Sequence, residues 1–319
     1  MIQYLNRILL DLKNKKIYAE DVIKLCESIL AENNDEQIRL KCLNLLIETG
    51  VLNEKIFEII ENLLISDINP HIRKAAATYI GEKFIHKALS PMKWVIRNET
   101  NLSCLISVIK TIVQIKTKES KKLLIDKLKE INESDFIDSH RQYENSKFQN
   151  ILTRLINNKE IETFTQKHLG DIIINFLIVS ELINTLYYVH FDLDPLSSLI
   201  KKLDLSDIEF EVRGWKSEFK NEIHDLAKLE GLEYLKELES LDLSNNLIED
   251  IKPLTHLANL KYLYLSNNKL DNPENIRILK SMKNLKYIDI KGNQIASNLK
   301  SKDFHENVKM ILSRNYYFR

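Results

Sequence analysis

Glycine and proline are scarce in this sequence. Its 319 residues include six glycines and five prolines, whereas average usage is about 7% and about 5% of residues. So few turn-forming residues favour long helices joined by few tight turns. The glycines also lie too far apart to form a phosphate-binding loop or a dinucleotide fingerprint, which excludes nucleotide binding through those motifs.

The sequence also lacks an excess of charge of either sign. Lys+Arg and Asp+Glu both number 46, so the formal net charge is zero. Proteins that bind nucleic acid commonly depend on a basic surface that attracts phosphate. The balance therefore gives no strong nucleic-acid signal.

Local motifs for metal binding and catalysis are missing. The three cysteines, Cys26, Cys42 and Cys104, are far apart, and we predict free buried thiols in a reducing compartment. The sequence contains no H-x-x-x-H pair, no C-x-x-C pair and no G-x-S-x-G elbow. We predict no metal, no cofactor and no catalytic residue, although a triad assembled from distant residues would leave no local motif.

A long uninterrupted hydrophobic run is absent as well. The most apolar window, 172–191, is interrupted by Asn175, Ser180, Glu181 and Asn184, whereas a membrane-spanning helix needs about 20 nearly continuous apolar residues. We predict a buried helix pair here and no membrane span. The N-terminus lacks the pattern of a secretion signal, so we expect a cytoplasmic protein.

The first half of the chain contains a repeated helical pattern. Segment 33–48 aligns with segment 67–82 at an offset of 34 residues, which pairs Ile38 with Ile72 and Cys42 with Ala76. The apolar residues recur at the spacing of one helix face. A third segment follows 33 residues later, with Leu105 in the position of Ile72. We predict alternating helices, a polar loop at 132–146 and the last helices at 160–192.

The second of these units carries the pattern D-x-N-P-x-x-I-R-x-x-A. Asp67 stands six positions before Arg73, and Asn33 and Arg39 occupy the matching positions of the previous unit. This pattern resembles HEAT repeats. The resemblance implies that Asp67, Arg73 and Arg39 are structural, because in that family such groups form a ladder between neighbouring repeats.

The third unit departs from the pattern. Thr100 and Ile106 stand in the two positions, so the ladder would stop or change there. An offset of 34 residues is also the period of tetratricopeptide repeats. The residue pattern of that family is absent, so we prefer the HEAT-like interpretation.

The second half changes to another repeat. L-x-x-L-x-L-x-x-N-x-L occurs with Leu or Ile at its apolar positions, starting at Leu238, Leu260 and Leu285. This pattern resembles the leucine-rich repeat, and its spacing resembles the short subclass found in regulators of a protein phosphatase and in intracellular adaptors. A degenerate copy starts at Ile200, with Ile208 in the asparagine position. We predict a helical insertion within 209–237, and a capping helix followed by a strand-like end in 301–319.

Three asparagines are the most conspicuous polar residues of these repeats. The resemblance implies that Asn246, Asn268 and Asn293 turn inward and bond to the backbone where the chain leaves each strand. Buried amides require such partners. We therefore predict a structural role for all three.

The residues that alternate with the buried leucines point out of the concave face of the expected sheet. Those that indicate partner binding are Asp242, Tyr262, Tyr264, Tyr287 and Asp289. Asp204 joins them if the degenerate repeat is real. Tyrosine is enriched in binding hot spots, so we predict that this face binds a partner. The alternative is that these side chains only cover the sheet.

The predicted architecture is an α-solenoid of HEAT-like helix pairs at 1–192, followed by an α/β leucine-rich repeat solenoid with a short curved parallel sheet at 193–319. Such surfaces favour a monomeric, non-catalytic scaffold or adaptor that binds a protein partner across the concave leucine-rich face. One alternative is a regulatory subunit of a GTPase, phosphatase or kinase. Two further alternatives are a HEAT-like DNA-processing enzyme, which the neutral charge argues against, and the sensor part of a signalling ATPase system.

Overall fold

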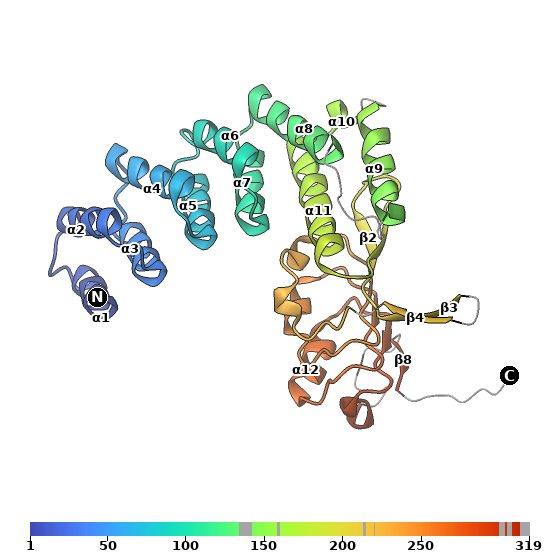
Figure 1. Ribbon diagram of the computed structural model, residues 1–319. Helices are drawn as coiled ribbons and strands as arrows, with labels where there is room; N and C mark the ends of the chain where they lie inside the picture. The colour runs from blue at the N-terminus through green and yellow to red at the C-terminus, as the bar shows by residue number, and fades with distance from the viewer. Residues whose placement is uncertain are drawn as a thin grey trace. The chain divides into compact units, whose positions relative to one another are not determined.

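The computed structural model of the chain (Figure 1) describes residues 1–133, 142–157, 160–212, 215–219, 221–299, 304 and 308–312. It describes the side chains of these residues except those of 132–133, 142–148, 160, 208–212 and 215–219. The chain divides into two compact units. We call residues 1–134 and 155–170 the helical unit, and residues 135–154 and 171–319 the sheet unit. The predicted division at 192/193 stays a prediction.

Helices make up the described part of the helical unit. They are α1 (Ile2–Lys13), α2 (Ala19–Glu32), α3 (Glu36–Glu48), α4 (Glu54–Ser66), α5 (Pro70–Lys83), α6 (Leu89–Asn98), α7 (Leu102–Gln114), α8 (Lys118–Glu133) and α10 (Glu160–Thr163). Two further helices, α9 (Gln142–Asn157) and α11 (Gln166–Thr185), have residues in both units. The predicted helix-rich first half is confirmed.

Capping residues explain where four of these helices begin. The side chains of Asp35, Asn53, Asn69 and Asn101 each accept a hydrogen bond from a backbone N–H in the first turn of α3, α4, α5 and α7, respectively. Such caps satisfy N–H groups that have no partner within the helix. Pro70 follows Asn69 at a first-turn position, where its missing N–H does no harm.

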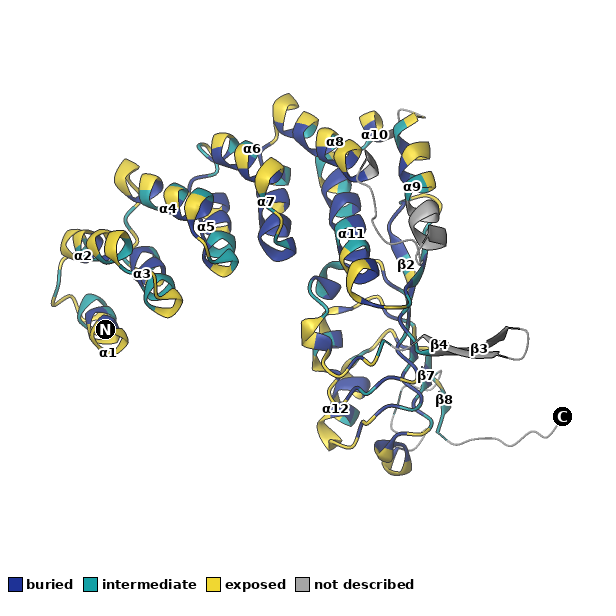
Figure 2. Ribbon diagram, in the orientation of Figure 1, coloured by how far each residue is buried: buried dark blue, intermediate teal, exposed yellow. Residues whose placement is uncertain are grey.

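Close packing joins α5 to α7. A Cβ atom added at Gly81 would lie 2.4 Å from Thr111 Oγ1, so only glycine allows the two helices to approach this closely. Thr111 Oγ1 also donates a hydrogen bond to the Ala77 carbonyl at 3.4 Å. Figure 2 shows the buried residues on the facing sides of these helices.

The end of the first half differs from the prediction. The helix expected after a loop at 132–146 already begins at Gln142, while 134–141 lies outside the described residues. The helix pair expected at 172–191 is wrong: α11 runs unbroken to Thr185 and the chain enters a strand at His190. Asn175 does not interrupt α11 because its amide is bonded, donating to the Asp171 carbonyl and accepting from the Ile200 N–H.

Among the described helices, α11 is long and apolar enough to cross a membrane by length and composition. Within its apolar window, 61% of the residues are buried. A core helix passes the same test, so this is weak evidence for a membrane span.

The sheet unit contains a mixed six-stranded sheet. Its strands are β1 (His190–Leu193), β2 (Ile200–Asp204), β5 (Ser240–Asp242), β6 (Tyr262–Tyr264), β7 (Tyr287–Asp289) and β8 (Lys309–Ile311), in that order across the sheet. β1 pairs antiparallel with β2, and every other pair is parallel.

Short helical turns return the chain between the parallel strands. They are η2 (Leu226–Lys228), η3 (Leu232–Tyr234), η4 (Lys252–His256), α12 (Pro273–Ser281) and η5 (Gln294–Asn298). Leu203, Leu241, Leu263 and Ile288 are register partners in neighbouring strands, and all four are buried. They form one continuous apolar row on the inner side of the sheet.

A β-hairpin replaces the helical insertion predicted within 209–237. β3 (Ile208–Val212) pairs antiparallel with β4 (Trp215–Phe219), and only single 3-10 turns follow. The prediction was wrong because residues 208–212 alternate apolar and acidic residues with a strand period of two. The prediction of a capping helix in the tail is also wrong where the tail is described, because Lys309–Ile311 form β8. Most of 301–319 lies outside the described residues.

Candidate functional site

An asparagine ladder joins the turns that leave the strands. Asn268 is 8% exposed. Its Nδ2 donates to the carbonyl of Leu265 in its own repeat at 3.0 Å and of Leu243 in the preceding repeat at 2.9 Å. Its Oδ1 accepts from the Ile248 N–H at 3.0 Å. One amide therefore satisfies backbone groups of two neighbouring repeats.

Asn246 and Asn293 repeat this geometry. Each Oδ1 accepts from a backbone N–H of the preceding repeat, at Ile223 and Leu270 respectively. Each Nδ2 donates to carbonyls of its own and the preceding repeat. All three predicted asparagines thus face inward onto the backbone.

A fourth asparagine, which the sequence analysis missed, belongs to this ladder. Asn221 Nδ2 donates to the Leu205 carbonyl at 3.0 Å and to the Tyr188 carbonyl, and its Oδ1 accepts from the Tyr188 N–H. Asn221, not Ile208, therefore occupies the asparagine position of the first repeat. The hairpin stands between Asp207 and Asn221, so the repeat pattern resumes only after the insertion.

The predicted partner-binding residues lie in two register rows on the outer side of the strands. We call these rows together the strand face. Ser240, Tyr262 and Tyr287 are register partners in one row, which Lys202 and Lys309 extend. The other row contains Asp204, Asp242, Tyr264 and Asp289 in that order. The structure therefore brings together all five predicted residues and adds Asp204.

Each aspartate of the strand face uses one oxygen to hold its own turn. Oδ1 of Asp204, Asp242 and Asp289 accepts from the backbone N–H two residues later, at 3.0, 2.9 and 3.0 Å. Among the described residues, none of the three carboxylates forms an ion pair. Burial raises the pKa of Asp242, with further contributions from the charges of Asp204 and Asp289.

The tyrosines form an aromatic cluster beside these carboxylates. The rings of Tyr264 and Tyr287 lie 5.0 Å apart, tilted by 42°, and Tyr262 is 39% exposed. The Lys309 ammonium lies 5.9 Å from the Tyr287 ring centroid. Burial, together with nearby Asp242 and Asp289, raises the pKa of both Tyr264 and Tyr287. Both phenols therefore stay neutral at physiological pH.

In the neighbouring row along the strands, Lys201, Glu239 and Lys261 pair with one another. Glu239 accepts from Lys261 at 2.7 Å and lies 3.6 Å from Lys201, which also contacts Asp194 at 3.0 Å. These charges largely satisfy one another. In the part of the chain that the structure describes, the strand face thus differs from these residues in having carboxylates that form no ion pair.

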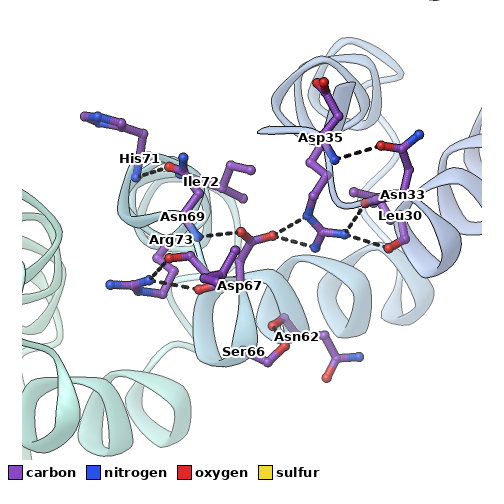
Figure 3. A network of polar contacts seen from close by, with 12 residues as sticks. Leu30, Asn33, Asp35, Asn62, Ser66, Asp67, Asn69, His71, Ile72 and Arg73 are labelled. Atoms are coloured by element: carbon purple, nitrogen blue, oxygen red, sulfur yellow. Dashed lines mark hydrogen bonds and ion pairs between the residues drawn. The ribbon is translucent and has the colours of Figure 1, made fainter. Parts of the chain in front are cut away.

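In the helical unit, Arg39 and Asp67 form an ion pair between repeats. Arg39 Nη2 lies 2.5 Å from Asp67 Oδ2, and the Asp67 side chain is fully buried. Arg39 also donates to the carbonyls of Leu30 and Asn33 at the end of α2 (Figure 3). Arg39 therefore joins the ends of α2 and α4.

Arg73 forms the next step, with a partner that the sequence analysis missed. Its Nε and Nη2 donate to the two oxygens of Glu99 at 2.7 and 2.8 Å, and it also donates to the Asp67 and Ile68 carbonyls at the end of α4. Burial opposes the charge of Glu99, but hydrogen bonds from Arg73 and from the backbone at Asn101 lower its pKa to about 2. We call these two ion pairs the arginine ladder.

The predicted alignment of the third unit was wrong by one residue. The capping residues Asn69 and Asn101 lie 32 positions apart, so Glu99, not Thr100, matches Asp67. Leu105, not Ile106, then matches Arg73. The ladder therefore continues to Glu99 and ends there, because α7 offers no arginine for a further step.

No group of three or more His, Cys, Asp or Glu side chains is placed to hold a metal ion among the described residues. Cys26, Cys42 and Cys104 are free and buried.

Comparison with known proteins identifies one part of the chain. Residues 236–277 match the family model for leucine-rich repeats, in two copies. The match covers the predicted repeats of Asn246 and Asn268. No curated protein and no solved structure matches the chain. Leucine-rich repeats are generally protein-interaction modules and are typically non-catalytic, and the match is consistent with an interaction role for this segment.

Proposed function

We propose that this protein is a non-catalytic scaffold or adaptor that binds a protein partner through the strand face. The observation that carries the proposal is the placement of three tyrosines and three aspartates in two register rows on the outer side of the strands. Tyrosine supplies a large contact area with a polar tip at low entropic cost. A sheet that only needed covering would not require carboxylates that form no ion pair with any described residue.

The proposal assigns HEAT-like repeats and a solenoid form to the helical unit, as a second contact surface or a rigid arm. The arginine ladder supports this assignment, because Arg39 links the ends of α2 and α4 and Arg73 links the ends of α4 and α6. We also propose that the protein is monomeric and cytoplasmic and that it has no cofactor. Its three free, buried thiols fit a reducing compartment.

The test is cross-linking capture from cell lysate with an amine-reactive reagent. Lys202, Lys286 and Lys309 are exposed within or beside the strand face, so we expect cross-links from a recovered partner to these lysines. A variant with Tyr262, Tyr264 and Tyr287 changed to Ala should lose that partner. The matched control changes three tyrosines outside the strand face, Tyr4, Tyr18 and Tyr187, which are 49%, 82% and 70% exposed.

Two results would contradict this assignment of the face. One is a partner that the strand-face variant retains while the variant still unfolds cooperatively at the temperature of the parent chain. The other is a set of cross-links confined to lysines of the helical unit, such as Lys83 or Lys110. Either result would transfer the binding role to the helices.

A further inference from the structure

We propose that the strand face binds arginine side chains of a basic segment in its partner protein. This inference rests on the proposed function and specifies the chemistry of the partner. Its structural basis is the position of Tyr264, which has Asp242 as its register neighbour on one side and Asp289 on the other. A flat cation over Tyr264 would therefore have a carboxylate on either side.

The carboxylates of this face have unused acceptor capacity. Oδ1 of Asp204, Asp242 and Asp289 is engaged by its own turn, and no described cation forms an ion pair with any of the three. Neighbouring strands lie about 4.8 Å apart, so Asp242 and Asp289, two strands apart, are separated by about twice that distance. Like charges at this spacing repel one another, and a bound cation would relieve the repulsion.

Four of the cations near the face are engaged elsewhere. Lys201 and Lys261 pair with Glu239, Lys202 lies 3.9 Å from Asp192, and the Lys309 ammonium lies over the Tyr287 ring. The contact between Lys309 and Tyr287 shows that a tyrosine ring of this face already interacts with a cation. The ring of Tyr264 lies 5.0 Å from that of Tyr287 and belongs to the row with the carboxylates.

Arginine fits this surface better than other cations do. Its guanidinium is planar, stacks on aromatic rings and donates several N–H groups in a fork that matches carboxylate oxygens. A lysine ammonium is more strongly hydrated and cannot bridge two carboxylates in one plane. A quaternary ammonium has no hydrogen to donate to the free oxygens. The aromatic and carboxylate groups together therefore select a guanidinium.

The experiment measures binding of defined peptides to the full chain by fluorescence anisotropy. The probe is a glycine–serine peptide that carries three arginines, and it is compared with the same peptide carrying lysine or the uncharged isostere citrulline. We expect the arginine peptide to bind more tightly than the lysine peptide, and the citrulline peptide not to bind. Affinity should fall with added salt, because exposed charges are screened.

The discriminating variant changes Asp242 and Asp289 together to Asn. Asparagine retains an oxygen for the turn N–H, so the fold is maintained while the charge is lost. We expect this variant to weaken binding of the arginine peptide about tenfold or more. The matched control changes Asp271→Asn with Glu249→Gln. Both residues are exposed and lie outside the strand face, and the control removes the same net charge, so it should bind like the parent chain.

The outcomes separate this inference from the proposed function. Failure of the arginine peptide to bind at millimolar concentration, or equal weakening in the control variant, would overturn the arginine assignment. If the captured partner still depended on the three tyrosines, the strand face would remain the binding surface and only its chemistry would be wrong. If that dependence also failed, both proposals would be wrong.

Discussion

The two units connect neighbouring repeats by different polar chemistry. The helical unit uses ion pairs, Arg39 with Asp67 and Arg73 with Glu99, whereas the sheet unit uses neutral amides such as Asn246 and Asn268. An asparagine supplies both donor and acceptor, so one residue type repeated in register extends the ladder. The arginine ladder needs two residue types in successive units.

This difference explains how far each ladder extends. Leucine at position 105 of α7 ends the arginine ladder after Glu99, because one substitution removes the next step. The asparagine ladder has four described members and continues across an insertion. A repeat built from one self-complementary residue tolerates more change between its members than a repeat built from a charged pair.

The largest expected effect comes from breaking the arginine ladder. Changing Arg73→Met leaves the Glu99 carboxylate, whose side chain is 3% exposed, without its cation. Removing one partner of a buried pair is strongly destabilising, and we expect the free energy of unfolding to fall by about 3 kcal/mol. Denaturant unfolding, together with hydrogen exchange across α4–α7, measures this loss of stability. Lys93→Met, which removes the exposed pair with Glu119, should leave the free energy of unfolding nearly unchanged.

Breaking the asparagine ladder should have a somewhat smaller effect. Asn268→Ala leaves the buried Ile248 N–H without its acceptor, whereas the carbonyls of Leu243 and Leu265 keep the amides of Asn246 and Asn293. Because one buried donor is left unsatisfied and a small cavity forms, we expect the free energy of unfolding to fall by about 2–3 kcal/mol. Hydrogen exchange should accelerate in β5 and β6. Asn259→Ala, which removes an exposed amide contact to Lys236, serves as the control, and an equal loss there would contradict the ladder's role.

Lowering the pH should weaken the arginine ladder but not the neutral asparagine ladder. We expect this change in stability to be the smallest of the three effects. Glu99 has a pKa of about 2 in the folded chain, below its ordinary value of 4.5, so its contribution is present above pH 4.5 and is lost as the pH falls towards 2. The expected loss is about 2 kcal/mol by pH 3. It should be seen in unfolding of the helical unit between these pH values. In the Arg73→Met variant this part of the pH dependence should disappear, and its persistence would assign the acid sensitivity to other carboxylates.

The sequence predicted the elements that repeat with a regular period. The strand face followed from alternation around Leu241, Leu263 and Ile288, and the register in the structure agrees. The helices around Ile38 and Ile72 followed from apolar spacing and their caps. Local backbone geometry dictates both patterns, so the sequence alone carries them.

The features that the sequence analysis missed lie where the spacing between repeats changes or where a tertiary contact decides the structure. Glu99 was missed because the second helical unit, from cap Asn69 to cap Asn101, is shorter than the first, from cap Asp35 to cap Asn69, and an alignment on apolar residues placed Thr100 in its position. Only the capping residue Asn101 carries the signal that corrects the alignment. The unbroken course of α11 was missed because Asn175 was treated as an interruption, although its partner, the Ile200 N–H, is remote in sequence. Tertiary contacts of this kind leave no local pattern.

The hairpin between Asp207 and Asn221 has a consequence for how such repeats are recognised and engineered. Joining Asp207 directly to Asn221 would give Ile200-Lys-Lys-Leu-Asp-Leu-Ser-Asp followed by Asn-Glu-Ile223, an uninterrupted leucine-rich repeat. The position is therefore a graft point, where a segment with its own strand pairing is accommodated while the asparagine behind it still reaches the Leu205 carbonyl. A search with fixed spacing misses such a repeat, and a designer gains a place to insert a binding loop without changing the repeats on either side.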